Sequence, residues 1–139
     1  MVASRDSQNR PFLGRAAGCY VSTGDRVRIF LSRRKYPFLF DAIRRTGVIA
    51  ASFSEPSTNK SLQLKGTGAE LAELEPGDAE RIAGHLNLFA ADVERMGIRG
   101  ALPRTVLAAP PEDLQAVVFV PAIAFIQTPG PVAGTRIGA

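Results

Sequence analysis

The fold can be read from residues 48–68, which run VIAASFSEPSTNKSLQLKGTG. Small and β-branched residues fill Val48–Ser54, a composition typical of a mostly buried strand. Glu55–Asn59 is a turn cluster, in which Pro56 fixes its own φ and has no N–H to donate to a sheet. Ser61–Thr67 then alternates apolar and polar residues with a period of two. This stretch therefore predicts two strands joined by a polar turn.

The second of these strands carries a polar row along one face. The row consists of Ser61, Gln63, Lys65 and Thr67, with Lys60 directly before it. The opposite face holds leucines and predicts a contact with the core. The polar row is either a solvated surface or a surface that binds an anionic ligand with many hydrogen-bonding groups. Both interpretations stay open at this point.

The segments before this pair predict a hairpin and a helix. Ala16–Ser22 and Arg26–Ser32 flank a turn that contains Gly24, and the second of these strands alternates as a half-buried strand does. A helix is expected over residues 36–46, because its second residue is a proline and Gly47 suits its C-cap.

The segments after the pair predict a second helix and two further strands. Asp78 is expected as the N-cap of a helix that ends near Gly97, since apolar residues recur along it at spacings of three and four. A connection over Ile98–Pro111 follows. Leu114–Thr128 is expected to form two strands, because Pro121 cannot donate to a sheet ladder.

Residues 1–12 are polar and are expected to form a loose terminal segment. We therefore divide the chain into a flexible N-terminal arm, residues 1–15, and a single domain, residues 16–139. The short links between strands favour antiparallel pairing. The predicted fold is mainly β with flanking helices: an antiparallel split β-barrel of about six strands, closed on itself, with two main helices packed outside.

A length of 139 residues suits one domain. No apolar run reaches the roughly 18 residues of a membrane span. The first residues lack the apolar centre of a secretory signal. Cys19 is the only cysteine, which excludes an intrachain disulfide and a zinc site built on several thiols. We therefore expect a cytoplasmic protein with no membrane contact.

The net charge of +4 is spread unevenly. Residues 1–35 hold eight Arg and Lys against two Asp, whereas residues 69–139 hold five Arg against nine Asp and Glu. A basic half attracts nucleic acid or a phosphate-bearing small molecule. Few aromatic residues are interleaved with the basic ones, and no nucleic-acid motif is present, so nucleic acid is the weaker of the two expectations.

Three cations lie at the junction between the predicted strand at 26–32 and the helix that follows it. They are Arg33, Arg34 and Lys35, and Ser32 precedes them. A helix N-terminus presents free N–H groups and the positive end of the helix dipole, so it favours an anion, and the cations add to this preference. The alternative interpretation is a solvated basic loop. If this segment and the one at 60–65 lie on adjacent elements of one sheet, they could clamp a phosphate together.

Residues 29–68, IFLSRRKYPFLFDAIRRTGVIAASFSEPSTNKSLQLKGTG, resemble the pyridoxamine 5′-phosphate oxidase-like family of FMN-binding split-barrel proteins. The resemblance covers residues 17–74 well and extends more weakly to the closing QTPGP run. In that family a basic segment between a strand and a helix holds the flavin phosphate, and a later strand also contacts FMN. The corresponding cofactor-binding residues here are Ser32, Arg33, Arg34, Lys35, Lys60, Ser61 and Gln63.

The resemblance also implies a homodimer with FMN at the subunit interface, and a flavin-dependent oxidoreductase of unknown substrate. There are two departures from the family pattern. The earlier strand that adds Arg and Lys contacts to FMN matches Arg15–Val21, which keeps only Arg15. The substrate-binding Arg and His of the oxidase have no counterpart in residues 129–139, so oxidation of pyridoxamine phosphate is not expected.

Two other functions stay open. One is a cofactor-free dimeric scaffold or sensor, suggested by the incomplete phosphate site. The other is a small basic barrel that binds nucleic acid, with binding that weakens steeply as salt rises. No residue stands out as a general acid or base, so the catalytic residues are unknown, and no metal site is predicted. His85 is interpreted as a partly buried packing residue on the second helix.

Overall fold

The computed structural model of this chain describes residues 1–98, 105 and 109–138. Its strands form two antiparallel sheets, in the orders β10-β9-β6-β5-β1-β2 and β3-β4-β8-β7. The elements are β1 (Val2–Arg5), β2 (Pro11–Gly14), β3 (Gly18–Val21), η1 (Thr23–Asp25), β4 (Val27–Ser32), α1 (Pro37–Thr46), β5 (Ile49–Ser54), β6 (Ser61–Gly66), β7 (Glu70–Ala72), α2 (Asp78–Arg95), η2 (Pro111–Asp113), β8 (Leu114–Phe119), β9 (Ile123–Ile126) and β10 (Arg136–Ile137). The predicted connection over Ile98–Pro111 lies largely outside the described residues.

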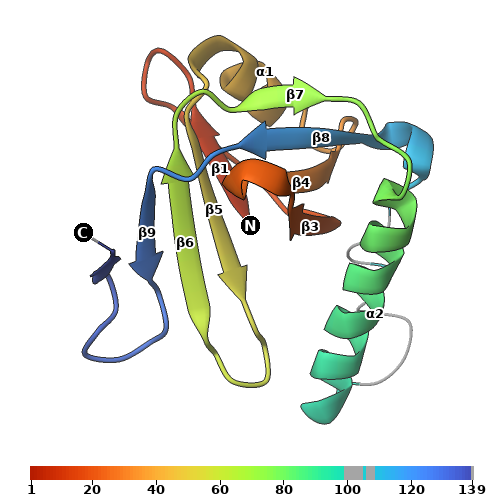
Figure 1. The fold of residues 1–139 in the computed structure, drawn as a ribbon, viewed down its shortest axis with the longest axis vertical. Helices are drawn as coiled ribbons and strands as arrows, with labels where there is room; N and C mark the ends of the chain where they lie inside the picture. The colour runs from red at the N-terminus through yellow and green to blue at the C-terminus, as the bar shows by residue number, and fades with distance from the viewer. Residues whose placement is uncertain (99–104, 106–108, 139) are drawn as a thin grey trace.

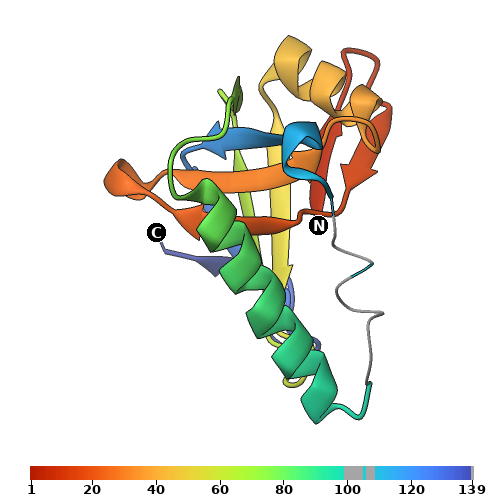
Figure 2. The same ribbon diagram turned by 90° about the vertical axis from the view of Figure 1, so that its right-hand side faces the viewer.

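The strands of the smaller sheet run across those of the larger one (Figure 1). α1 covers one end of this assembly, and α2 descends along one side of it. The quarter turn in Figure 2 shows that the two helices stay well apart. The predicted mainly-β split barrel with two main helices is therefore confirmed, although the described strands form two separate sheets and not the closed barrel that we expected.

The core lies between the two sheets and α1, and β4 is at its centre. Val27, Ile29 and Leu31 face the core and are each at most 4% exposed. The opposite face of β4 is also buried, so every residue of this strand is inaccessible to solvent. The prediction of a half-buried strand is wrong here, because alternation along β4 reflects two different buried environments and not one buried and one solvated face.

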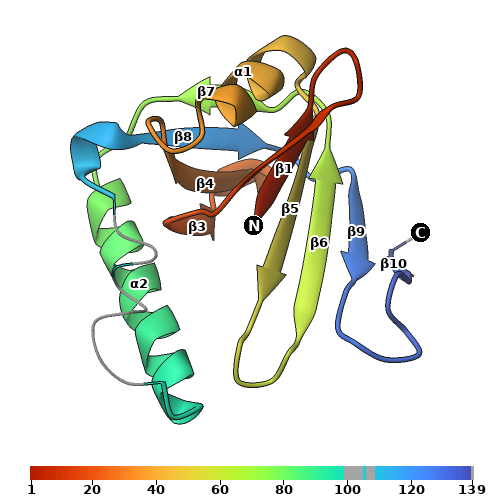
Figure 3. The same ribbon diagram turned by 180° about the vertical axis from the view of Figure 1, so that it is seen from behind.

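The N-terminal residues are part of the larger sheet, so the prediction of a flexible arm over residues 1–15 is wrong for the strands at 2–5 and 11–14. β1 pairs with both β2 and β5, with Val2 opposite Ala51 (Figure 3). The polar residues that suggested disorder form the turn of this hairpin. Asp6 accepts the backbone N–H groups of Gln8 and Arg10 at 2.9 and 3.0 Å and so fixes the turn.

The remaining predicted elements lie close to their expected places. α1 ends at Gly47, whose φ of +64° suits a glycine C-cap. Pro121 separates β8 from β9, and the chain crosses there from one sheet to the other. α2 begins at Asp78, but Gly77 occupies the N-cap position, so the prediction of Asp78 as N-cap is wrong.

Candidate functional site

The predicted phosphate-binding turn between β4 and α1 is filled by a carboxylate of the chain itself. The Ser32 hydroxyl donates to Asp113 Oδ2, and the backbone N–H of Arg34 donates to Asp113 Oδ1 at 2.9 Å. The N–H of Arg33 donates to the backbone carbonyl of Asp113 at 2.8 Å. The N–H of Lys35 donates to the Ser32 hydroxyl at 3.1 Å. The backbone donors of the turn therefore already have partners within the chain.

The side chains of this turn also contact the segment around Asp113. The guanidinium of Arg33 donates to the Glu112 carbonyl at 2.8 Å, and Arg34 Nε lies 3.8 Å from Asp113 Oδ1. The hydrogen bond from the Ser32 hydroxyl is the main cause that lowers the pKa of Asp113, so this buried group is a carboxylate at neutral pH. A cofactor phosphate does not fit inside the turn while Asp113 occupies it.

The second group of predicted residues lies elsewhere. Ser61 and Gln63 belong to β6 in the larger sheet, and Lys60 directly precedes that strand, whereas Ser32 ends β4 in the smaller sheet. The hypothesis that both basic segments lie on one sheet is therefore wrong. Figures 1 and 3 show the end of the β5–β6 hairpin far from α1, where the other group lies. One copy of the chain does not bring the seven predicted residues together.

A cleft of about 350 Å³ opens between α2, β3 and the free end of β5. Its walls are largely apolar: Val2 and Ile29 come from the two sheets, and Phe53 and Phe89 supply aromatic rings from β5 and α2. This volume lies within the range of small-molecule and cofactor sites, which are commonly apolar with a few polar groups.

The polar groups of the cleft include Arg15, Cys19, Ser52, Ser54 and His85. No Asp or Glu occurs among its described lining residues. The cleft therefore combines aromatic walls, hydroxyl groups and one guanidinium, a set that suits a flat aromatic ligand with polar edges and negative charge.

Two of the predicted residues lie directly opposite residues of β5 that line this cleft. The side-chain amide of Gln63 donates to the Ser52 hydroxyl at 3.2 Å, and the Ser54 and Ser61 hydroxyls lie 2.8 Å apart. Lys60 and Ser61 also border a second hollow of about 640 Å³, which shares Phe53 and Ser54 with the cleft. The polar row predicted from the sequence is thus linked to the cleft through hydrogen bonds, with Ser52 and Ser54 in direct contact with the open space.

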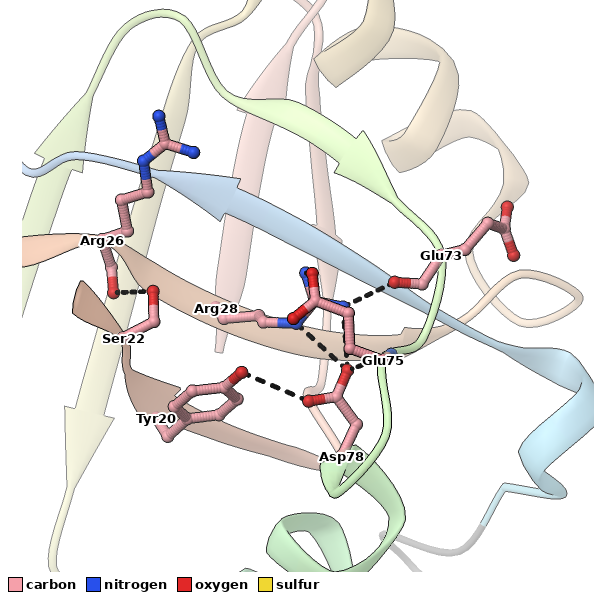
Figure 4. Close-up of polar contacts among 7 residues, drawn as sticks. All are labelled: Tyr20, Ser22, Arg26, Arg28, Glu73, Glu75 and Asp78. Atoms are coloured by element: carbon pink, nitrogen blue, oxygen red, sulfur yellow. Dashed lines mark hydrogen bonds and ion pairs between the residues drawn. The ribbon is translucent and has the colours of Figure 1, made fainter. Parts of the chain in front are cut away.

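The first turn of α2 is held to the smaller sheet by a buried ion pair (Figure 4). Arg28 NH2 lies 2.8 Å from Asp78 Oδ2, and both side chains are almost fully buried. Tyr20 donates to Asp78 Oδ1 at 3.3 Å, and the Arg28 guanidinium also donates to the Glu73 carbonyl. Burial alone would raise the pKa of Asp78, but the hydrogen bonds and the charge of Arg28 lower it.

The last turns of α2 are held by a second carboxylate. Asp92 accepts the backbone N–H of Ser57 at 3.0 Å and the Ser57 hydroxyl at 2.6 Å. Ser57 belongs to the turn between β5 and β6, so α2 is attached to one sheet at each end. The Ser57 hydroxyl is the main cause that lowers the pKa of Asp92. The middle of α2, between these two attachments, forms one wall of the cleft with His85 and Phe89.

Burial shifts the pKa of two side chains that line the cleft. It lowers the pKa of the His85 imidazole and raises the pKa of the Cys19 thiol. Both groups are therefore neutral at pH 7. Among the described residues, no group of three His, Cys, Asp or Glu side chains is arranged to hold a metal ion. No described helix is long and apolar enough to cross a membrane.

Sequence reasoning missed most of the cleft residues. The sequence connects Cys19 only with disulfides and thiol zinc sites, and it indicates only a packing role for His85. No local pattern marks either one, because they meet only through the packing of α2 against β3. One signal was present in Gly18, where an added Cβ would lie 3.3 Å from the backbone of Ile82. A glycine in a short strand marks such a close approach.

No protein-family model matches the sequence, and no curated protein matches it. Solved structures do match. A tagged HupZ protein of Group A Streptococcus has a TM-score of 0.54 at 19% identity, with 96% of this chain and 88% of that chain covered. An F420 reductase has a TM-score of 0.48 at 17% identity, covering 88% and 85% of the two chains.

A pyridoxamine 5′-phosphate oxidase-related, FMN-binding protein from Nostoc punctiforme PCC 73102 is also similar, with a TM-score of 0.46 at 12% identity and with 94% of this chain and 75% of that chain covered. At these identities the likeness concerns the fold alone. The resemblance predicted from the sequence is confirmed as a likeness of fold.

Proposed function

We propose that this chain binds a flavin, FMN in the first instance, in the cleft under α2, and that it acts as a flavin-dependent oxidoreductase of unknown substrate. One observation carries the proposal: a cleft of about 350 Å³ with aromatic walls, hydroxyl groups and a guanidinium, and no carboxylate among its described lining residues. A flavin ring has apolar faces and a hydrogen-bonding edge, which matches this lining.

The residues of the cleft have different roles in this proposal. Phe53 and Phe89 contact the faces of the ring, and Arg15, Ser52 and Ser54 lie around its polar edge. Gln63 orients the Ser52 hydroxyl. The flavin supplies the redox chemistry when it is bound, and the protein supplies orientation and a carboxylate-free environment.

The cleft is open on one side, and the family resemblance implies a homodimer with the cofactor at the interface. We include that dimer in the proposal: a second copy closes the cleft. The turn at Ser32–Lys35 does not bind the FMN phosphate in this proposal, because Asp113 already accepts its hydrogen bonds. Among the described cleft residues, Arg15 is the guanidinium that would pair with that phosphate, so riboflavin, which lacks the phosphate, should bind more weakly than FMN.

The test is a visible absorption spectrum of the purified protein, followed by titration with FMN and with riboflavin. Phe89→Ala should weaken both ligands. Leu88→Ala is the matched control, because Leu88 is the next residue of α2 and is 75% exposed to solvent. Failure of the wild-type protein to bind either flavin, or equal binding by the two variants, contradicts the proposal. Sedimentation of the same samples measures the oligomeric state.

A second candidate function is a cofactor-free dimeric scaffold, and Asp113 favours it. A turn that already holds a carboxylate has no need of a cofactor phosphate. This candidate predicts a dimer whose melting temperature does not change with FMN or riboflavin, since a ligand that binds only the native state must stabilise it.

A further inference from the structure

The turn between β4 and α1 has the chemistry of an anion site. Arg33 and Arg34 supply two guanidinium groups, and the N-terminus of α1, a ten-residue helix, follows directly. α1 has no acidic residue in its first turn and no side-chain cap of its own. The positive end of the helix dipole and the two cations therefore lack a counter-charge from within the turn or from α1 itself.

Asp113 supplies that counter-charge from a distant part of the chain. It lies at the end of η2, 81 residues from Ser32, and is only 5% exposed. Both carboxylate oxygens accept hydrogen bonds from the turn, one from the Ser32 hydroxyl and one from the N–H of Arg34. A neutral side chain in this place would leave those donors without a charged acceptor.

We infer that the Ser32–Lys35 turn is an anion-binding site which the chain fills from within, with the Asp113 carboxylate in place of a phosphate on a bound ligand. Occupation by Asp113 also attaches η2 and the start of β8 to the start of α1. The inference does not depend on whether the cleft binds a flavin, and its tests use no flavin.

The first test uses the wild-type protein and inorganic phosphate. The backbone amide of Arg34 is followed by ¹⁵N NMR while phosphate is added at constant ionic strength. We expect no saturable shift of this signal, because Asp113 already accepts its hydrogen. A saturable shift with phosphate, absent with chloride, would show that the turn is open to external anions and would overturn the inference.

The second test removes the carboxylate. Asp113→Ala should lower the melting temperature, and formate or phosphate should then raise it where chloride does not. The rise should be roughly 5 °C at ten times the dissociation constant of the anion, for a chain of this length. Asp41→Ala is the control, because Asp41 is an exposed carboxylate on α1 that pairs with the exposed Arg44 and Arg45. Equal responses to oxyanions in wild type and Asp113→Ala would contradict the inference.

Asp113→Asn covers the case in which the alanine variant does not fold. It keeps the shape of the side chain but removes its charge. It should be less stable than wild type at pH 7, and the difference should shrink as pH falls below about 4 and through the lowered native pKa of Asp113, where that side chain becomes neutral as well. An asparagine variant that matches wild type at pH 7 would show that the charge of Asp113 is not what the turn binds.

Discussion

Gln63 donates its side-chain amide to the hydroxyl of Ser52 at 3.2 Å. Ser52 lines the cleft under α2 and Gln63 does not. Gln63 lies directly opposite Ser52 in the β5–β6 pair. A residue that the family resemblance assigned to cofactor contact therefore lies beside a residue of the cleft lining and fixes the direction of its hydroxyl.

The Gln63–Ser52 pair should act as a unit in ligand binding. We expect Gln63→Leu and Ser52→Ala each to weaken FMN roughly fivefold, the effect of about 1 kcal/mol from one hydrogen bond. The double variant should lose little more than either single variant, because both changes remove the same interaction. Fluorescence quenching of FMN measures the four affinities. Gln115→Leu, which changes a glutamine on β8 away from the cleft, should bind as wild type does, and additive losses would refute the coupling.

The buried ion pair at the first turn of α2 should dominate the stability of that helix. Asp78→Asn leaves the Arg28 guanidinium buried without its charged partner and should cost about 3–5 kcal/mol of unfolding free energy. Glu75 is the other carboxylate near Arg28, and its side chain is 64% exposed. Glu75→Gln should therefore cost less than about 1 kcal/mol of unfolding free energy. Urea unfolding of the two variants gives both values. Similar losses would mean that the pair contributes no more than a surface contact.

Acid should destabilise the fold through aspartates whose native pKa is lowered, among them Asp78, Asp92 and Asp113. The pKa values of Asp78, Asp92 and Asp113 are lowered in the native state, so their ionised forms stabilise the fold above the unfolded value of about 3.9. This stability is lost as pH falls below about 4 and through the lower native pKa values. Asp92→Asn should make the acid limb of the stability curve shallower, as measured by urea unfolding from pH 2 to pH 6. An unchanged limb would exclude Asp92 as a contributor.

His85 should give the stability curve a second, smaller slope near neutral pH. Burial lowers its native pKa, so below about pH 6.5 the unfolded chain binds a proton that the folded chain resists. The free energy of unfolding should therefore fall as pH drops from about 7 to the native pKa and then level off. His85→Gln should remove this slope. Because His85 is the only histidine, a slope that persists in the variant would have to come from another group.

The local sequence pattern was enough to predict the elements whose residues show a clear periodicity, a helix cap or a proline break. The period-two alternation of Ser61–Gly66, Gly47 at the end of α1 and the break at Pro121 all describe chemistry within a few residues. β1 and β2 were missed because four-residue strands are too short for a periodic signal, and the polar turn between them has the composition of a disordered tail.

The site could be predicted only in fragments. The basic turn and the polar row were both visible in the sequence, but their separation on two sheets depends on the long-range pairing of β4 with β8 and of β6 with β9. Asp113 follows two prolines and a glutamate, and no sequence pattern near it indicates that it binds the turn after β4. The cleft exists because Asp78 and Asp92 attach α2 at both ends, and no sequence pattern connects either one to Arg28 or Ser57.

The pairing of β4 with β8 also sets the order in which the chain can fold. Val27 lies opposite Phe119, so the central strand of the smaller sheet is synthesised long before its main partner. Until β8 has left the ribosome, the short β3 is the only neighbour of β4 in the smaller sheet. The apolar residues of β4 are then not yet fully buried. Non-local pairing of this kind slows folding and exposes apolar strands to aggregation. A nascent chain that stalls before residue 114 should therefore be the form most dependent on chaperones.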